Sequence, residues 1–252
     1  MSGDGLRVLL AGESWVSLGI HMKGFASYTT GTYEEGWAPL ARAFEGFAEL
    51  VYIPNHRAIL DFPDTAEQLA AFDAVLFSDI AADTLLLHPD TLVRAIVRPN
   101  RLRAIQEYVA QGGGFGMIGG YMSFSGFEGK ANYRNTPIAQ ILPVVIDSAD
   151  DRIEVPEGFN PTTQDASHPI MHGISKDWPT LLGYNRFAAK PLGRTLMRHG
   201  DDPFLVIGSY EQGRTLAYAS DCSPHWGSPQ FVDWEHYTPF WRQLVTWLAG
   251  RS

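Results

Sequence analysis

The sequence predicts an α/β fold built around an open, doubly wound and mostly parallel sheet. Residues 6–120 alternate short apolar runs with segments of helical periodicity, the pattern of parallel strands joined by crossover helices. The first run, LRVLLA at 6–11, is apolar throughout, as expected of a strand buried on both faces. In the second half strands follow one another with few helices between them, which predicts an antiparallel hairpin added to the same sheet.

Four strands and three helices are expected in the first half. The strands are expected at 6–11, 49–54, 73–80 and 115–120, and the helices at 33–46, 64–72 and 100–114. Asp64 and Glu67 form a capping box, and Asn100 is placed to cap the clearest helix, which Gly112 ends. Residues 12–32, rich in Gly and Tyr, are expected to form a long loop.

The second half is less regular. Strands are expected at 143–155, 183–190 and 195–200, followed by a hairpin over 203–221 that turns at residues 211–213. Residues 232–250 are expected to form a closing helix with Pro239 near its start. Neither a repeat nor a linker interrupts the pattern, so residues 1–252 are expected to form a single domain.

Composition excludes several classes of function. A net charge of −9 argues against nucleic-acid binding, and the arginines of 94–103 are expected to be a solvated helix face. The single cysteine, Cys222, excludes an internal disulfide and a multi-thiolate metal site. No apolar run is long enough for a membrane span or a signal segment, so we expect a cytoplasmic protein with no membrane partner.

Four loops are expected at the carboxyl ends of the strands, where open α/β sheets bind ligands. They are GESW at 12–15, SDI at 78–80, GGYMSFSG at 119–126 and SDCSPHW at 220–226. Together with TPI at 136–138, ILPV at 141–144 and HPIMHGI at 168–174, these loops resemble the class I glutamine amidotransferase-like superfamily. The closer resemblance is to a branch that carries GESW after the first strand, and it covers nearly the whole chain. It implies a flavodoxin-like, three-layer fold.

The resemblance does not extend to the nucleophile. Members of the superfamily place a cysteine in Gly-x-Cys-x-Gly at the elbow after the fourth strand, assisted by a late His-x-Glu pair. Gly119 stands where that cysteine is expected, and no His-x-Glu pair follows the last hairpin strand. Ordinary glutaminase activity is therefore not expected.

Three residues of one loop are candidates for catalysis. Cys222 lies beside Asp221 and three positions before His225, which brings a thiol, a carboxylate and a base together in sequence. A lone cysteine is also commonly a small buried hydrophobe, and Asp221 and His225 could simply cap the turn and stack on Trp226. Asp221 and His225 remain the expected acid and base, with Cys222 kept as a nucleophile that is easily tested.

Further residues are candidates for substrate binding. Glu13 follows a buried strand, where a carboxylate needs a partner, and His21 or Lys23 could supply it. Ser14 would line the cleft or cap its loop. The wider set expected at the cleft, which includes backbone groups that could hold an oxyanion, is Glu13, Ser14, His21, Gly119, Gly120, Tyr121 and Ser123, with Asp79 and Tyr184 as further walls.

No cofactor is predicted, although Glu13, His21, Asp221 and His225 offer ligands for a divalent metal. Two functions stay open. One is an amidotransferase-like hydrolase acting on a small polar molecule through Asp221 and His225. The other is a catalytically silent binding or assembly module on the same fold. The aromatic residues of the closing helix, Trp234, Phe240, Trp241 and Trp247, would support a homo-oligomer if they were exposed.

Overall fold

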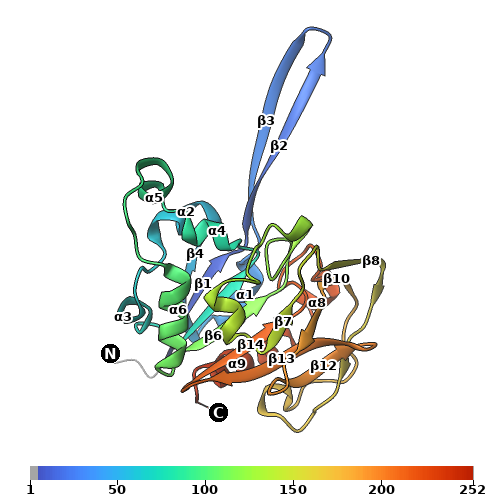
Figure 1. Ribbon diagram of the computed structural model, residues 1–252. Coiled ribbons are helices and arrows are strands. Elements are labelled where there is room, and N and C mark those ends of the chain that lie inside the picture. Colours follow the sequence, from blue (N-terminus) through green and yellow to red (C-terminus); the bar gives the residue numbers. More distant parts are fainter. Residues whose placement is uncertain (1–4, 252) are drawn as a thin grey trace.

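A computed structural model describes residues 5–251 and has an eight-stranded mixed sheet at its centre (Figure 1). The strand order is β4-β1-β5-β6-β14-β13-β12-β9, in which the first five strands are mutually parallel and the last three are antiparallel. The predicted α/β class is thus confirmed. The sheet strands are β1 (Leu6–Gly12), β4 (Ala48–Ile53), β5 (Ala74–Ser78), β6 (Gly114–Ile118), β9 (Thr162–Thr163), β12 (Arg194–His199), β13 (Asp202–Tyr210) and β14 (Gly213–Tyr218).

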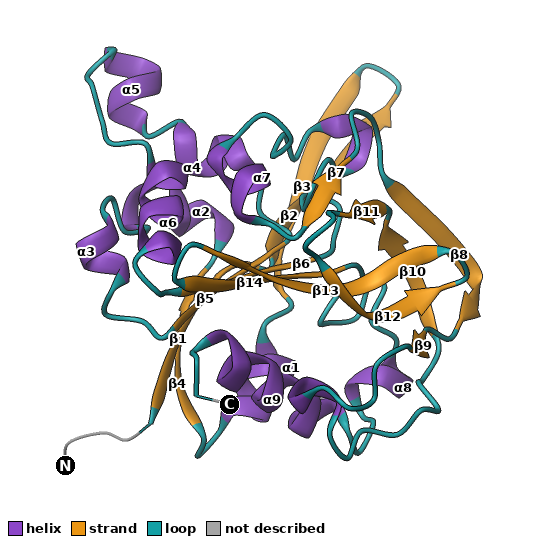
Figure 2. Ribbon diagram, turned by 60° about the horizontal axis from the view of Figure 1, so that its bottom comes forward, coloured by secondary structure: helices purple, strands orange, loops and turns teal. Residues whose placement is uncertain are grey.

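Helices cover both faces of this sheet, so that the chain forms three layers (Figure 2). One layer contains α2 (Asn55–Asp61), α3 (Ala66–Leu69), α4 (Ala82–Leu86), α6 (Arg101–Ala110) and α7 (Pro137–Ile141), and α5 (Pro89–Arg94) projects beyond it. The opposite layer contains α1 (Ala38–Phe44), α8 (Pro229–Val232) and α9 (Tyr237–Leu248). Covering both faces explains why the central strands are rich in apolar residues, with nearly continuous runs such as those at 8–11 and 74–77.

Two small antiparallel sheets and two 3₁₀ turns complete the body. One sheet pairs β8 (Arg152–Phe159) with β10 (Leu181–Asn185), and the other pairs β7 (Val144–Ile146) with β11 (Phe187–Ala189). The 3₁₀ turns are η1 (Phe127–Gly129) and η2 (Pro169–Met171). Within residues 5–251 no helix combines the length and apolarity that crossing a membrane requires.

Local signals located some helix ends correctly and others wrongly. The Asn100 side chain accepts hydrogen bonds from the first turn of α6, as predicted. The expected box at Asp64 is wrong, because Thr65 caps α3 while the Asp64 carboxylate accepts hydrogen bonds from Arg98 and Arg101. Arg101 is also not solvated: it is buried and donates to three backbone carbonyls at the end of α2, so the arginines of this segment are not one exposed face.

The closing helix is shorter than the predicted 232–250, because α8 ends at Val232 and α9 begins only at Tyr237, and the aromatic residues of the segment belong to the core. Pro239 lies in the first turn of α9. Phe240 and Trp241 are completely buried, while Trp234 and Trp247 pack against the core. Helix α9 lies against β14, β6 and α1, so it has no free apolar face for an oligomer contact.

The largest departure from the predicted fold is at residues 12–32. Instead of a loop, the chain forms β2 (Ser14–Lys23) and β3 (Ala26–Glu35), a regular antiparallel hairpin that projects far from the body (Figure 1). The expected helix at 33–46 is shortened to α1 because β3 takes its first residues. We refer to residues 14–35 as the arm.

Candidate functional site

The predicted cleft lies at the carboxyl ends of β1, β5, β6 and β14, where the four loops meet. A cavity of about 450 Å³ opens there. Three carboxyl groups, an imidazole and aromatic and apolar side chains surround it, and the full lining is Glu13, Trp15, Asp79, Tyr121, Met122, Asp221, Pro224 and His225. The topology assembles this set, because the ends of neighbouring parallel strands meet at one edge of the sheet.

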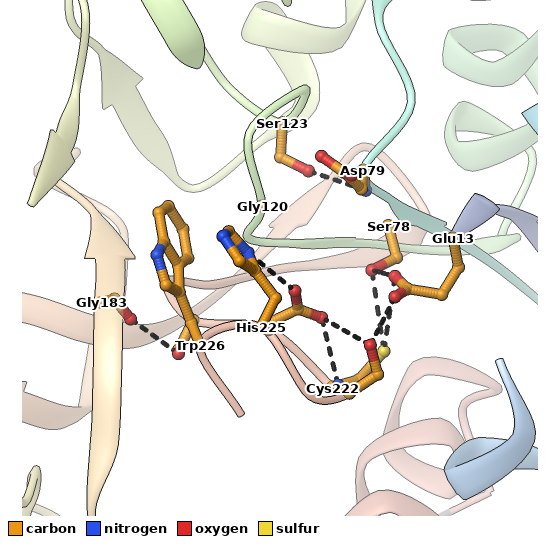
Figure 3. A network of polar contacts seen from close by, with 12 residues as sticks. Glu13, Ser78, Asp79, Gly120, Ser123, Gly183, Cys222, His225 and Trp226 are labelled. Atoms are coloured by element: carbon orange, nitrogen blue, oxygen red, sulfur yellow. Dashed lines mark hydrogen bonds and ion pairs between the residues drawn. The ribbon is translucent and has the colours of Figure 1, made fainter. Parts of the chain in front are cut away.

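Glu13 is a buried carboxyl group held by hydroxyls. Ser78 Oγ donates to Glu13 Oε2 at 2.5 Å, and Ser223 Oγ donates to Glu13 Oε1 at 2.6 Å (Figure 3). No cation pairs with it among residues 5–251, and Lys23 lies at the far end of the arm. Burial, reinforced by the nearby Asp221 charge, raises the pKa of Glu13 from 4.5 to about 7. The predicted partner was therefore the wrong chemical type.

Two more carboxyl groups face the same cavity. Burial raises the pKa of Asp221 to about 8, with the Asp79 charge adding to the effect. Burial also raises the pKa of Asp79, to about 6, and the Glu13 charge contributes. Asp79 Oδ1 accepts a 2.6 Å hydrogen bond from the Met122 backbone, which favours its ionised form. The three groups therefore lose their protons over the neutral range rather than in acid.

The backbone at two of these carboxyl groups has an unusual conformation. Glu13 has a φ of 48° and Asp79 a φ of 50°, the left-handed region that residues with a Cβ seldom adopt. Each follows the last residue of its strand, and Gly12 and Ser78 pair across those strand ends. Such conformations persist where surrounding contacts enforce them, and they concentrate at functional sites. The turns aim both carboxyl groups at the cavity.

His225 connects the buried acids to the surface. Its Nδ1 lies 3.6 Å from Asp221 Oδ2, and 40% of its side chain is exposed. The ring stacks on Trp226 with a centroid distance of 5.2 Å (Figure 3). It also meets Tyr121 edge to face, with a centroid distance of 4.4 Å. Both stacking on Trp226 and an approach to Asp221 are thus present. Tyr121 lies on the cavity wall, as predicted.

The elbow after β6 lacks a nucleophile, as expected, and its backbone N–H groups are also occupied. Gly119 N donates to the carbonyls of Tyr218 and Ser220, and Gly120 N donates to Asn185 Oδ1 at 2.9 Å. These N–H groups are not free to hold an oxyanion, so that expectation is wrong. A Cβ at Gly119 would lie 2.0 Å from the Ala219 carbonyl oxygen, so no nucleophile fits there.

Asn185 and Asp151, which the sequence did not single out, hold the elbow loop in place. Asn185 Nδ2 donates to Asp151 Oδ1 at 2.8 Å, and the backbone N–H groups of Ser125 and Gly126 donate to the same carboxylate. Both side chains are buried. The strand pattern around them carried no signal for this contact, because it forms between segments distant in sequence.

Cys222 lies behind the cavity wall rather than on it. The side chain is buried, and its Sγ lies 3.6 Å from Ser78 Oγ and 3.8 Å from Glu13 Oε2. Burial, together with the charges of Glu13 and Asp221, raises the pKa of the thiol well above its usual range. A protonated, enclosed thiol is not a nucleophile, so a catalytic role for Cys222 is not supported.

The metal set suggested by the sequence does not assemble as expected. His21 lies on the arm, where it stacks on Tyr28 and contacts Thr30, so it belongs neither to a metal site nor to the cleft. Ligand atoms of Glu13, Asp221 and Cys222 do lie within 4.8 Å of one another. Burial raises the pKa of all three groups, so a cation there would have to compete with protons for them.

Three other predicted residues have structural roles. Ser14 Oγ accepts from the Asn55 backbone, which joins the base of the arm to α2. Ser123 Oγ donates to the Ile118 carbonyl and accepts from Asp79 N, so its hydroxyl holds the elbow in shape. Tyr184 donates to Asp202 Oδ2 and packs with aromatic side chains away from the cavity.

The sheet order, the elbow and the loops around it define an amidotransferase-like α/β protein whose elbow holds no nucleophile. The family model described as "Putative glutamine amidotransferase" (GATase1-like) matches residues 7–250, and this chain belongs to that family. Family membership agrees with the flavodoxin-like fold.

Solved structures agree with this assignment. Cytoplasmic protein STM1381 from Salmonella typhimurium LT2 is 45% identical, and cytoplasmic protein STM3548 from Salmonella typhimurium is 42% identical. Each match has a TM-score of 0.93 and covers 96% of this chain and 99% of the other. A thua-like protein from Bacteroides uniformis, 12% identical with a TM-score of 0.56, covers 97% of this chain and 92% of its own and shares the fold alone. No curated protein matches the sequence.

Proposed function

We propose that this protein is an enzyme that transfers protons to and from a small polar substrate, most simply during hydrolysis by water. The observation that carries the proposal is the meeting of Asp79, Asp221 and His225 at one cavity of about 450 Å³. A binding module needs shape and satisfied hydrogen bonds, whereas an enzyme needs an acid and a base facing one space. The cavity supplies both.

The two aspartates divide the roles of acid and base. Asp79, with a pKa raised to about 6, is mostly ionised at neutral pH and can accept a proton. Asp221, with a pKa raised to about 8, mostly keeps its proton and can donate it. Different environments have separated the two pKa values, as in enzymes that use one carboxyl group as acid and another as base.

His225 is proposed to exchange the Asp221 proton with solvent. It joins the buried carboxyl group to the surface, because its Nδ1 faces Asp221 Oδ2 while the ring is partly exposed. Glu13 would orient the substrate through whichever oxygen its serine partners leave available. Trp15 and Tyr121 would limit its size and exclude bulk water.

Water is the proposed nucleophile. Cys222 is protonated and enclosed, Ser123 and Ser223 are buried and hydrogen-bonded, and Gly119 has no room for a side chain. Ordinary glutaminase chemistry, which needs a thiolate at the elbow, therefore has no support in this chain. The proposed location is the cytoplasm, supported by the two Salmonella relatives, which are described as cytoplasmic proteins.

The alternative is a silent module that binds the same kind of molecule without changing it. The closed elbow favours this alternative, because neither the nucleophile nor the oxyanion-binding N–H groups of the fold are free. Both functions use the same cavity. They differ in whether a bound compound is converted.

The experiment compares binding with turnover. Small amides, carboxylic esters and lactones, with glutamine included, are screened for thermal stabilisation and then for product release. Asp221→Asn and His225→Gln should abolish turnover of any compound that is converted, while His172→Gln, an exposed histidine outside the cavity, should leave it unchanged. Binding that Asp221→Asn weakens, without conversion of any bound compound, would favour the silent module. Turnover that Asp221→Asn and His225→Gln leave unchanged would refute the proposal, and conversion of glutamine would contradict the expectation that this chain lacks ordinary glutaminase activity.

A further inference from the structure

The arm carries an apolar face that nothing in residues 5–251 covers. Residues 16–23 of β2 alternate between apolar and polar or Gly positions, and the four apolar residues on one face are between 61% and 75% exposed: Val16, Leu18, Ile20 and Met22. Their cross-strand neighbours on β3 are Tyr33, Gly31, Thr29 and Ser27. We call this surface the apolar face of the arm. Such alternation is typical of a strand with one side buried.

The opposite face of the arm is polar. It carries Ser17, Gly19 and His21 on β2 and Thr32, Thr30 and Tyr28 on β3. A two-stranded hairpin with no support is marginally stable in water, and an exposed apolar strand invites pairing. The arm is nevertheless ten residues long in each strand and extends clear of the body (Figure 1). The sequence of the arm therefore suits a hairpin whose apolar face is covered by another molecule.

We propose that the apolar face of the arm packs against the same face of a second copy of this chain, with the two arms antiparallel about a two-fold axis. The charge pattern favours a second copy in this orientation. Lys23 is the arm's one Lys or Arg and lies at its tip, while Glu34 and Glu35, its two acidic residues, lie at its base. Lys23 and Glu34 lie on the polar face, so their charges act along the length of the arms and not across the packed faces. Antiparallel arms bring each tip toward the partner's base, whereas parallel arms would bring like charges together.

The size of the contact agrees with this arrangement. Ten residues span about 33 Å, and two strands with their side chains are about 10 Å wide, so one face measures roughly 330 Å². A stable interface buries about 800 Å² on each partner, so each arm must also contact the partner's body. Antiparallel overlap allows this, because the tip with its fully exposed Phe25 reaches the partner's base. A hollow of about 410 Å³ lies there, lined in part by Ser14, Trp15 and Val16.

A membrane is a less suitable occupant. The free edges of β2 and β3 would leave backbone N–H and C=O groups without partners in hydrocarbon, which costs several kcal/mol for each group. Polar side chains also cover the other face of the hairpin, and the net charge of −9 disfavours approach to an anionic bilayer. In a dimer in water those edges and that polar face stay hydrated.

The test is the mass in solution of two matched variants. Leu18→Lys adds a charge to the apolar face, and Ser17→Lys adds the same charge to the neighbouring residue on the polar face. Both side chains are exposed, so neither change should affect folding, which circular dichroism checks. Sedimentation should find a dimer for the wild type and Ser17→Lys. For Leu18→Lys the dissociation constant should rise about thirtyfold or more, because each dimer carries the substitution twice.

Three results would overturn the proposal. They are a monomeric wild type, a dimer that Leu18→Lys leaves intact, and equal dissociation of both variants. Flotation with neutral and anionic phospholipid vesicles tests whether the arm binds a membrane instead. If the wild type were a monomer that floated with the vesicles, and Leu18→Lys abolished that flotation, the arm would be assigned to a membrane instead of a second copy. Ile20→Lys repeats the test at another position of the same face.

Discussion

Replacing Glu13 with glutamine should stabilise the protein in mild alkali and have much less effect in acid. The carboxyl group is buried without a cation, and its pKa is raised from 4.5 to about 7. Between those values the folded state keeps a proton that the unfolded state releases, so wild-type stability falls as the pH rises and levels off above about 7. Glutamine has no charge and removes this dependence.

The magnitude follows from the size of the pKa shift. A rise from 4.5 to about 7, at about 1.4 kcal/mol for each unit, gives a cost of about 3 kcal/mol once Glu13 is ionised. This is an upper value, because part of the shift comes from the Asp221 charge. Most of the cost is absent at about pH 5 and nearly all is present at about pH 8. The advantage of Glu13→Gln should therefore grow by about 2 kcal/mol or more between them.

The assay is urea unfolding at the two pH values, followed by tryptophan fluorescence. Protein concentration is held constant, because any dimer would make the stability depend on it. Glu235→Gln is the control, since that side chain is 83% exposed and should show no such pH dependence. If the stability difference between Glu13→Gln and the wild type were the same at both pH values, the assignment of Glu13 as an uncompensated buried acid would be wrong.

Other predictions follow from the same site. If Asp79 acts as the base and Asp221 as the acid, kcat/KM should follow a bell-shaped pH profile whose limbs fall near pH 6, for Asp79, and near pH 8, for Asp221. Asp79→Asn should abolish the acidic limb together with most activity. Cys222 should react with a thiol reagent only after unfolding, and Cys222→Ala should keep ligand binding; rapid labelling of the native protein would contradict its burial. Gly119→Cys should not create glutaminase activity and should lower stability by about 2 kcal/mol or more in urea unfolding, because its Cβ would collide with the Ala219 carbonyl. An unchanged midpoint would show that the elbow can relax.

The arm shows where sequence patterns were misread. Gly19, Gly24 and Gly31 and the neighbouring tyrosines suggested a loop, yet residues 16–22 alternate as a strand does. Because glycine readily adopts turn conformations as well as extended ones, the three glycines favoured a loop over a strand. The exposure of the apolar face could not be anticipated, because a period of two predicts one buried side without saying which chain buries it.

The local sequence determined the strand and helix order, the Asn100 cap and the loops that form the cavity, since hydrophobic periodicity and capping act over a few residues. Tertiary structure decided the chemistry of those loops. It surrounded Glu13 with serines instead of a cation, enclosed Cys222, turned Asp79 into the cavity and used the elbow N–H groups for Asn185 and the neighbouring strand. Burial, pKa and hydrogen-bond satisfaction depend on groups from distant segments, and only the folded chain brings those groups together.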